Sequence, residues 1–270
     1  MINKENTVLM KLEEIKNIQD FQTFLTGQKN ENFVQPNDPE YTKTICGTNL
    51  QSEILYVLPA TETLENIQFY HHLKFITINN YKVDSKKIAV LKKYADKLAN
   101  VTHLHIWNIK QSDLSLLSLF PNLTHLLISH LKKADFSFDS LDGVKKLNTL
   151  CLLAFNKMAD LSFIPTSSQK RLKSLSITYA QNLKSLKGID QFENLENLSL
   201  FASTMESNKK VDLEDLSGIE RLTKLRSFEI GYFRFGIAEM QERLSFLKEL
   251  KSFSIDNVAT KTNNSATTNP

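Results

Sequence analysis

The sequence has few cysteines and little net charge, and each scarcity argues against a class of protein. Its two cysteines, Cys46 and Cys151, lie far apart in 270 residues and match no metal or redox spacing. We interpret them as reduced thiols of a cytosolic protein. The formal net charge is +3, from 33 basic and 30 acidic residues. That excess is too small to indicate binding to nucleic acid or to an anionic membrane.

Long apolar runs and catalytic motifs are also missing. The densest apolar segment, residues 114–120, is too short to span a bilayer. Residues 1–6 include a glutamate and begin no long apolar region, so we expect no secretory signal and a cytoplasmic protein. The chain contains no G-x-S-x-G, P-loop, G-x-G-x-x-G or H-E-x-x-H motif. We therefore expect a protein that is not an enzyme and needs no cofactor.

What the sequence has in abundance is one repeated motif, L-x-x-L-x-L. Its first, fourth and sixth positions hold leucine, isoleucine, valine or phenylalanine, and successive copies start 22 to 30 residues apart. The eight copies start at Leu73, Val101, Leu123, Leu147, Leu172, Leu195, Leu225 and Leu250. This period and signature resemble those of a leucine-rich repeat solenoid. The resemblance implies an α/β fold with a parallel sheet on the concave face and helices, 3-10 turns and loops on the convex side.

Short segments between the repeats refine the resemblance. Phrases such as Asp160-Leu161-Ser162, and Ser217-Gly218 further on, are similar to the short subclass found in bacterial internalins and in phosphatase-regulating repeat proteins. Those families place an asparagine at the ninth motif position, where it bonds the next turn. Here that position holds other residues, so we expect a less regular coil: Tyr81, Ile109, Leu131, Phe155, Ala180 and Ser203.

The repeats divide the chain into three parts. Residues 1–72 are predicted to be a helical N-terminal cap, because residues 6–26 have apolar side chains at helical spacing and a solenoid must cover its first repeat. Residues 73–257 are the repeat domain. Residues 258–270 are small and polar, and we expect a disordered tail. Residues 86–98 and 238–250 are predicted to be helices between repeats.

Alternation along a strand separates the core positions of the motif from those on the concave face. The third, fifth and seventh positions carry almost no charge and no lysine or arginine, which argues against a nucleic acid ligand. Basic side chains such as Lys74, Lys173, Arg226 and Lys251 occupy the second position, where we interpret them as a solvated rim. Because exposed apolar rows mark interaction sites, we predict a protein-binding face. Its candidate residues are Phe75, His103, His105, Trp107, His125, Leu127, Leu153, Tyr179, Phe201, Glu229 and Tyr232.

Two residue types on this face allow other interpretations. Trp107, the single tryptophan, is either a binding anchor or a side chain folded against a neighbouring turn. His103, His105 and His125 fall on adjacent strands, where they form either a weak candidate zinc site or polar filler. Cys151 is also expected on this face, as an exposed thiol or, with His125, as a conceivable dyad.

The sequence thus leads to one main functional hypothesis and two alternatives. The main one is a non-enzymatic module that binds a partner protein on its concave face, for example as a toxin-neutralising immunity protein or a scaffold. It would be a monomer or part of a hetero-complex. The first alternative is a zinc-binding or hydrolytic site at His103, His105 and His125, and the second is a structural subunit that associates with itself.

Overall fold

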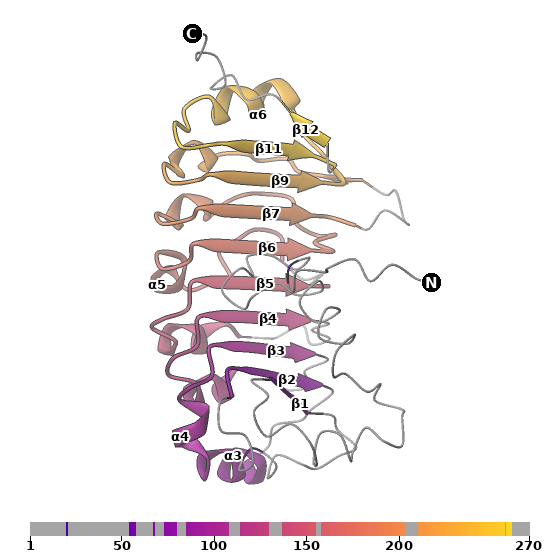
Figure 1. Ribbon diagram of the computed structural model, residues 1–270. Coiled ribbons are helices and arrows are strands. Elements are labelled where there is room, and N and C mark those ends of the chain that lie inside the picture. Colours follow the sequence, from indigo (N-terminus) through magenta and orange to yellow (C-terminus); the bar gives the residue numbers. More distant parts are fainter. Residues whose placement is uncertain are drawn as a thin grey trace, which may run out of the picture.

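The structure, a computed structural model, describes most of the repeat region and a few residues before it. The described residues are 20, 54–57, 67, 73–79, 85–107, 114–129, 137–154, 158–203, 210–256 and 258–260. Strands of one sheet are stacked along the molecule in chain order, and the connecting segments run behind them (Figure 1). All neighbouring pairs are parallel except the last, in which β12 runs antiparallel to β11. This is the solenoid that the repeats predict.

Every predicted repeat contains a five- or four-residue strand. The sheet comprises β1 (Ile54–Val57), β2 (Phe75–Asn79), β3 (His103–Trp107), β4 (His125–Ser129), β5 (Thr149–Leu153), β6 (Ser174–Thr178), β7 (Asn197–Phe201), β9 (Ser227–Gly231), β11 (Ser252–Ile255) and β12 (Val258–Thr260). A separate pair joins β8 (Val211–Asp212) to β10 (Phe233–Arg234). The convex side holds α3 (Ser85–Lys92), α4 (Ala95–Leu98), η3 (Ser115–Leu119), η4 (Asp139–Gly143), α5 (Thr166–Gln169), η5 (Ile189–Gln191), η6 (Ile219–Arg221) and α6 (Ile237–Leu244).

The core lies between the sheet and the convex segments. First, fourth and sixth motif positions, such as Leu195, Leu198 and Leu200 of one repeat, are at most 1% exposed and belong to one continuous cluster. Buried residues of the convex turns, among them Leu186 and Phe192, complete that cluster. Burying such side chains stabilises each by about 1.5–3 kcal/mol. The motif therefore fixes which side of every strand faces inward.

Backbone hydrogen bonds join each coil to the next just before the strands. The carbonyl of Lys74 accepts bonds from the amides of Thr102 (2.9 Å) and His103 (3.0 Å) in the following repeat. The same double acceptance recurs at the carbonyls of Thr102, Thr124, Asn148, Lys173, Glu196 and Arg226. This ladder uses only main-chain groups, so it holds the register whatever side chain the second motif position carries.

The coil is more regular than the missing asparagines suggest. From β2 to β9, each strand residue pairs with the same motif position of the next strand. After the strands, main-chain bonds at the eighth or ninth position hold successive coils together, as between the Ala180 amide at the ninth position and the Phe201 carbonyl (3.0 Å). The buried methyl of Ala180 therefore stands where a ladder asparagine would be.

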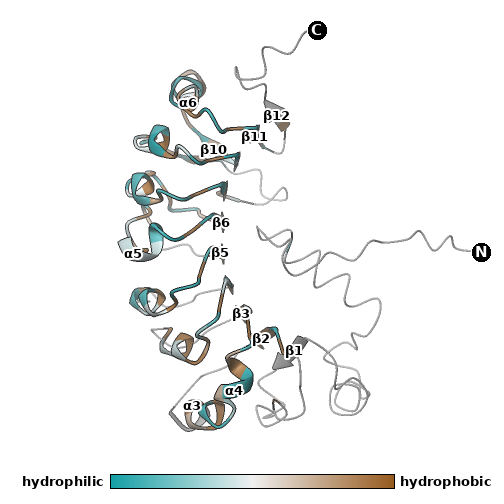
Figure 2. Cartoon of the chain, turned by 60° about the vertical axis from the view of Figure 1, so that its left-hand side comes forward, coloured by the Kyte–Doolittle hydropathy of each residue, from teal (hydrophilic) through white to brown (hydrophobic). Residues whose placement is uncertain are grey.

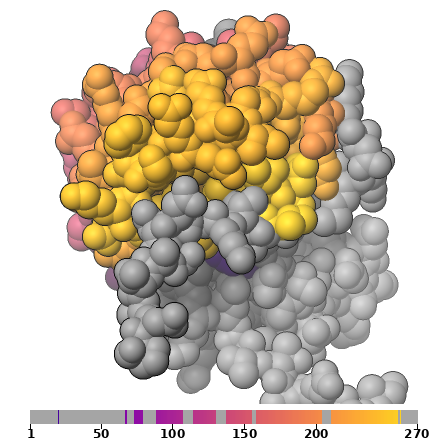
Figure 3. Space-filling model, turned by 90° about the horizontal axis from the view of Figure 1, so that it is seen from above, coloured from indigo at the N-terminus to yellow at the C-terminus, as the bar shows by residue number. Residues whose placement is uncertain are grey.

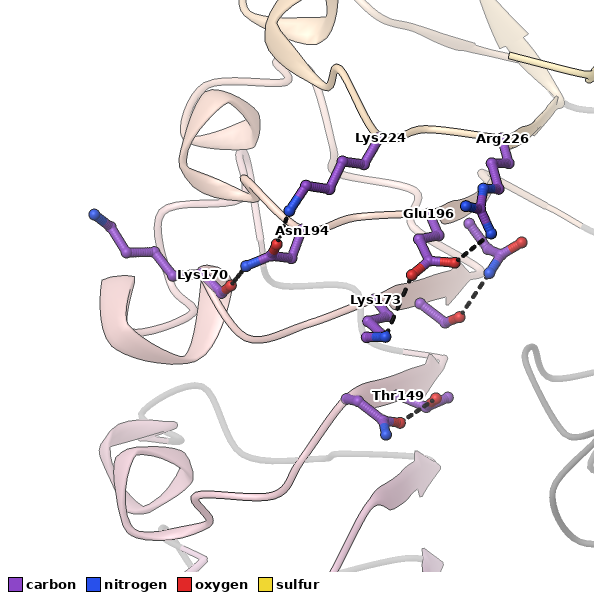
Figure 4. A network of polar contacts seen from close by, with 10 residues as sticks. Thr149, Lys170, Lys173, Asn194, Glu196, Lys224 and Arg226 are labelled. Atoms are coloured by element: carbon purple, nitrogen blue, oxygen red, sulfur yellow. Dashed lines mark hydrogen bonds and ion pairs between the residues drawn. The ribbon is translucent and has the colours of Figure 1, made fainter. Parts of the chain in front are cut away.

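Asparagines do link coils at the opposite end of the strand. Asn122 Nδ2 donates to the Ala99 carbonyl (2.7 Å), and Asn194 Nδ2 donates to the Lys170 carbonyl (2.7 Å). Figure 4 shows the second of these bonds, with Lys224 donating to the side-chain oxygen of Asn194. Both asparagines directly precede the first leucine of their repeat, a position that the family comparison did not single out.

The predicted segments between repeats differ from the structure in their lengths. The helix predicted over 86–98 is divided into α3 and α4, and the one predicted over 238–250 ends at Leu244. The helical cap predicted within residues 1–72 falls almost wholly outside the described residues. Within that range, β1 adds a strand to the sheet before the first predicted repeat. Residues 258–260, predicted as the start of a disordered tail, form β12.

The last repeat forms the C-terminal end of the solenoid. Figure 3 shows this end as a rounded surface coloured for the final residues of the chain. Three large apolar side chains are exposed on α6, the loop after it and β12: Ile237 (56%), Phe246 (66%) and Val258 (66%). Phe246, in the loop after α6, lies away from the concave strand positions, which makes it a useful control for substitutions there.

Candidate functional site

The predicted concave positions form continuous rows across the sheet. At the fifth motif position, register aligns Thr77, His105, Leu127, Cys151, Ser176, Ser199 and Glu229 side by side. The third position forms a parallel row that runs from Phe75 through His103 and His125 to the serines of later strands. The described helices lie on the other side of the sheet (Figure 2). The sequence thus correctly predicted which residues are neighbours on this face.

These concave side chains are buried, whereas the sequence led us to expect exposed ones. Phe75 and Cys151 are 0% exposed, Leu127 is 2% and Phe201 is 5%. None of these four belongs to the core cluster, which contains their strand neighbours on the opposite face. An open sheet leaves one face to solvent. Their burial therefore means that polypeptide covers the concave face.

Three aromatic rings form a stack on the first strands of this face. The rings of His103 and His125 lie 4.1 Å apart at an interplanar angle of 12°, and Phe75 stacks on His103 at 6.2 Å. Preceding threonines fix both imidazoles, because Thr102 and Thr124 each place a hydroxyl 2.8 Å from the Nδ1 of the following histidine. These contacts thus hold the two imidazole rings in the orientation in which they stack.

The geometry of the histidines does not favour a shared zinc ion. A metal binds in the plane of an imidazole ring, and the rings of His103 and His125 are nearly parallel, so one ion cannot lie in both planes. His105 directs its Nε2 to the Ser129 hydroxyl at 3.1 Å. Among the described residues, no group of three histidine, cysteine or acidic side chains is arranged to hold a metal.

Cys151 lies at the centre of the face and is unsuited to nucleophilic chemistry. Its register neighbours are Leu127 and Ser176, while His125 is aligned with Thr149. Burial raises the pKa of the Cys151 thiol well above its ordinary value, and the negative charge of Asp20 raises it further. A catalytic cysteine needs a lowered pKa. The thiol instead remains protonated and behaves as a small apolar group.

A glycine beneath Phe201 shapes the C-terminal half of the face. A Cβ on Gly231, the register neighbour of Phe201, would lie 2.5 Å from its ring. Phe201 therefore packs directly against the bare backbone of β9, and the ring of Tyr232 lies 6.4 Å away. Tyr232 has φ +62°, and its amide donates to Asp256 Oδ1 (2.6 Å), which links it to the last repeat.

The remaining predicted residues lie at the borders of the buried rows. His125, Leu153, Tyr179, Glu229 and Tyr232 are partly exposed. Tyr179 has the same left-handed backbone as Tyr232, at φ +62°, because both follow their strand at the eighth motif position. The backbone of Trp107 ends β3, and its side chain is outside the described part of the chain.

Buried hydroxyls are a feature of this face that the sequence reasoning missed. Four of them have no hydrogen-bond partner among the described residues: those of Thr77, Ser176, Thr178 and Ser199. Leaving a buried polar group unpaired costs about 1–3 kcal/mol. In the sequence, the small side chains at consecutive fifth motif positions are the signal that could have revealed this feature. They indicate a surface that contacts another polypeptide closely.

The predicted basic rim is paired with acidic side chains in the second half of the sheet. Glu196 lies between Lys173 (3.4 Å) and Arg226 (3.2 Å), both from the second motif position, as Figure 4 shows. The two basic side chains are largely exposed and Glu196 is partly exposed, so each pair stabilises the fold by at most about 1 kcal/mol. Paired in this way, they do not form a basic track for phosphates.

Comparisons with known proteins extend to the fold alone. No family model and no curated protein matches the chain. The chain is similar to the solved structure of an internalin from Listeria monocytogenes, with 13% identity over 75% of this chain and 67% of that one, at a TM-score of 0.38. It is also similar to the structure of a leucine-rich repeat protein of Leptospira interrogans. The identity there is 16% over 74% of this chain and 52% of that one, at a TM-score of 0.44.

A third similar structure is a leucine-rich repeat-containing protein from Legionella pneumophila. It is 14% identical over 79% of this chain and 93% of that one, at a TM-score of 0.32.

In the described part of the chain, no helix has both the length and the apolar character to cross a membrane. With eight motif copies and matching register from strand to strand, the chain has the fold of a leucine-rich repeat solenoid.

Proposed function

We propose that the protein is a non-enzymatic module that binds a partner protein on the concave face of its solenoid. One observation carries the proposal: the face is buried to 5% or less at Phe75, Leu127 and Phe201, yet these side chains are not part of the core. Such a surface is complete only when polypeptide covers it. The partner would take the place of that cover.

The chemistry of the face favours protein over other ligands. Its apolar and aromatic side chains suit the apolar side of a helix or strand, and its unpaired hydroxyls suit main-chain or polar side-chain groups. Glu229 and Asp256 are its charged residues, and both are acidic, which disfavours a phosphate backbone. Phe201, seated on Gly231, is held ready as an anchor, and a preordered side chain loses little entropy on binding.

Within this class, the two finer roles differ in the kind of partner. An immunity protein binds one toxin tightly, whereas a scaffold binds components of an assembly. The regular strand register and the nearly uncharged concave face are compatible with either role. We propose Phe75, His103, His105, Trp107, His125, Leu127, Leu153, Tyr179, Phe201, Glu229 and Tyr232 as the contact residues.

The test compares a concave anchor with an exposed aromatic residue elsewhere. Purified chains carrying Trp107→Ala with Phe201→Ala, or Phe246→Ala alone, serve as baits in an extract of the native cell. The wild type and Phe246→Ala should retain the same partner, and the concave variant should lose it, because truncating a binding anchor costs about 2 kcal/mol or more. Retention by a folded concave variant would contradict the proposal, as would capture of nothing by the wild type.

A further inference from the structure

The concave face is covered, and the described convex elements cannot cover it. Side chains at its centre, such as Thr77, Cys151 and Ser176, are 0% exposed although the helices pack against the opposite face of the sheet. Neighbouring strands shield a side chain only from the sides. The cover therefore comes from a part of the chain other than these convex elements.

One described residue outside the repeats identifies that segment. Asp20 is helical and partly buried. Its charge acts on the Cys151 thiol, although 131 residues separate the two in the sequence. Because the interaction of charges weakens with distance, this effect favours a position for Asp20 near Cys151, on the concave side of the sheet.

The sequence around Asp20 suits such a position. Residues 6–26 have apolar side chains at helical spacing, including Leu12, Ile15, Ile18 and Phe21. A helix with an apolar side needs a surface against which to bury it. The uncharged, apolar rows around Leu127 and Cys151 offer one in the same chain.

The tether between this segment and the sheet is long enough. Four strand steps separate β1 from β5, a distance of about 19 Å at the usual spacing of about 4.8 Å. The 34 residue steps from Asp20 to Ile54 can extend to roughly 110 Å. A tethered segment also has an effective concentration in the millimolar range, on the order of 1 mM, so modest affinity keeps it bound.

We propose that residues 6–26 dock as a helix on the concave face of their own sheet and act as an internal ligand. They cover the apolar rows in the absence of a partner. The second half of the inference, which rests on the proposed function, is that a partner protein must displace this helix. The binding site would then prefer an amphipathic helix with few charges on its apolar side.

A cross-linking experiment on the full chain tests the docking without any partner. In a chain that carries Cys46→Ser and Cys151→Ser, Asp20→Cys provides one thiol, and Leu153→Cys, on the same strand as Cys151 but partly exposed, provides the other. A short bis-maleimide should join the two within one molecule, which peptide mapping detects. Glu193→Cys, on the exposed convex side, replaces Asp20→Cys in the control and should give no link to Leu153→Cys. Absence of the Asp20→Cys link, or links between molecules only, would overturn the proposal.

A second pair of variants tests whether the segment docks through its apolar side. Ile18→Asp places a charge on the apolar side of the segment, and Asn17→Asp places the same charge on a polar residue. We expect Ile18→Asp to lower the yield of the cross-link at least about fivefold and Asn17→Asp to leave it nearly unchanged. Equal yields would contradict docking through the apolar side. Failure of partner capture, with the cross-link intact, would instead contradict the proposed function alone.

Discussion

Strand β4 presents two leucines to two different environments. Leu126 is 0% exposed within the continuous core, and Leu127 is 2% exposed outside it, on the concave face. The core side repeats leucine, isoleucine or phenylalanine from strand to strand, whereas the concave side changes from aromatic rings to small hydroxyls. The two leucines are therefore buried for different reasons. The repeated face holds the fold together, and the varied face is the one that we propose binds a covering polypeptide.

The largest expected effect comes from breaking the core side of this pair. Leu126→Ala should lower the free energy of unfolding by about 2–5 kcal/mol, because it leaves a cavity in a rigid core. Leu127→Ala removes the same atoms from a surface that can lose its cover, so we expect less than half that loss. Denaturant unfolding of both variants provides the measurement. Equal losses would show that the two faces form one core.

A substitution beneath Phe201 perturbs the concave side without removing any of its groups. Gly231→Ala places a methyl 2.5 Å from that ring, so the ring must move. Overpacking of this kind costs about 1–3 kcal/mol, and we also expect weaker partner capture. Gly143→Ala is the matched control, since a Cβ there meets nothing within 4 Å. If Gly231→Ala leaves both stability and capture unchanged, Phe201 is not a fixed anchor.

The link between coils at Asn194 should matter less than either face. Asn194→Ala removes the bond to the Lys170 carbonyl, and we expect a loss of about 0.5–1.5 kcal/mol with no change in partner capture. Thermal unfolding and the capture assay measure the two effects. A loss of capture at normal stability would place the binding site at the strand beginnings rather than on the concave rows.

The smallest effect is expected at the rim. Glu196→Gln removes a partly exposed carboxylate between Lys173 and Arg226, and stability should fall by at most about 1 kcal/mol, less at high salt. Unfolding at low and high ionic strength separates the contribution of charge. A large, salt-independent loss would show that the rim supports the fold as strongly as the core does.

The sequence predicted the arrangement of the sheet well because the repeat motif is local. Placing Leu104 and Ile106 in the core also places His103 and His105 on the other face, and the constant motif aligns His103 with His125. The links between coils were harder to predict. Asn122 and Asn194 bond across coils from a position outside the family's ladder, and main-chain bonds at Ala180 replace the ladder itself.

Burial of the concave residues could not be predicted from the repeats. Phe75, Leu127 and Phe201 occupy positions that face solvent in an isolated sheet, and whether they are covered depends on residues far away in the sequence. Asp20 and Cys151 provide the example, since no local pattern brings them together. Position in the motif determines the direction of a side chain, and distant segments determine its exposure.

The reactivity of Cys151 tests most directly whether the concave face is covered. In a Cys46→Ser background, we expect the native chain to be alkylated slowly, at a rate that rises little from pH 7 to 9. An ordinary thiol, by contrast, ionises at about pH 8.5 and reacts much faster over this range. The reason is that Cys151 is 0% exposed and burial raises its pKa. Denaturant should restore ordinary rates. A native thiol that reacts as fast as an unfolded one would show an open face and contradict the account.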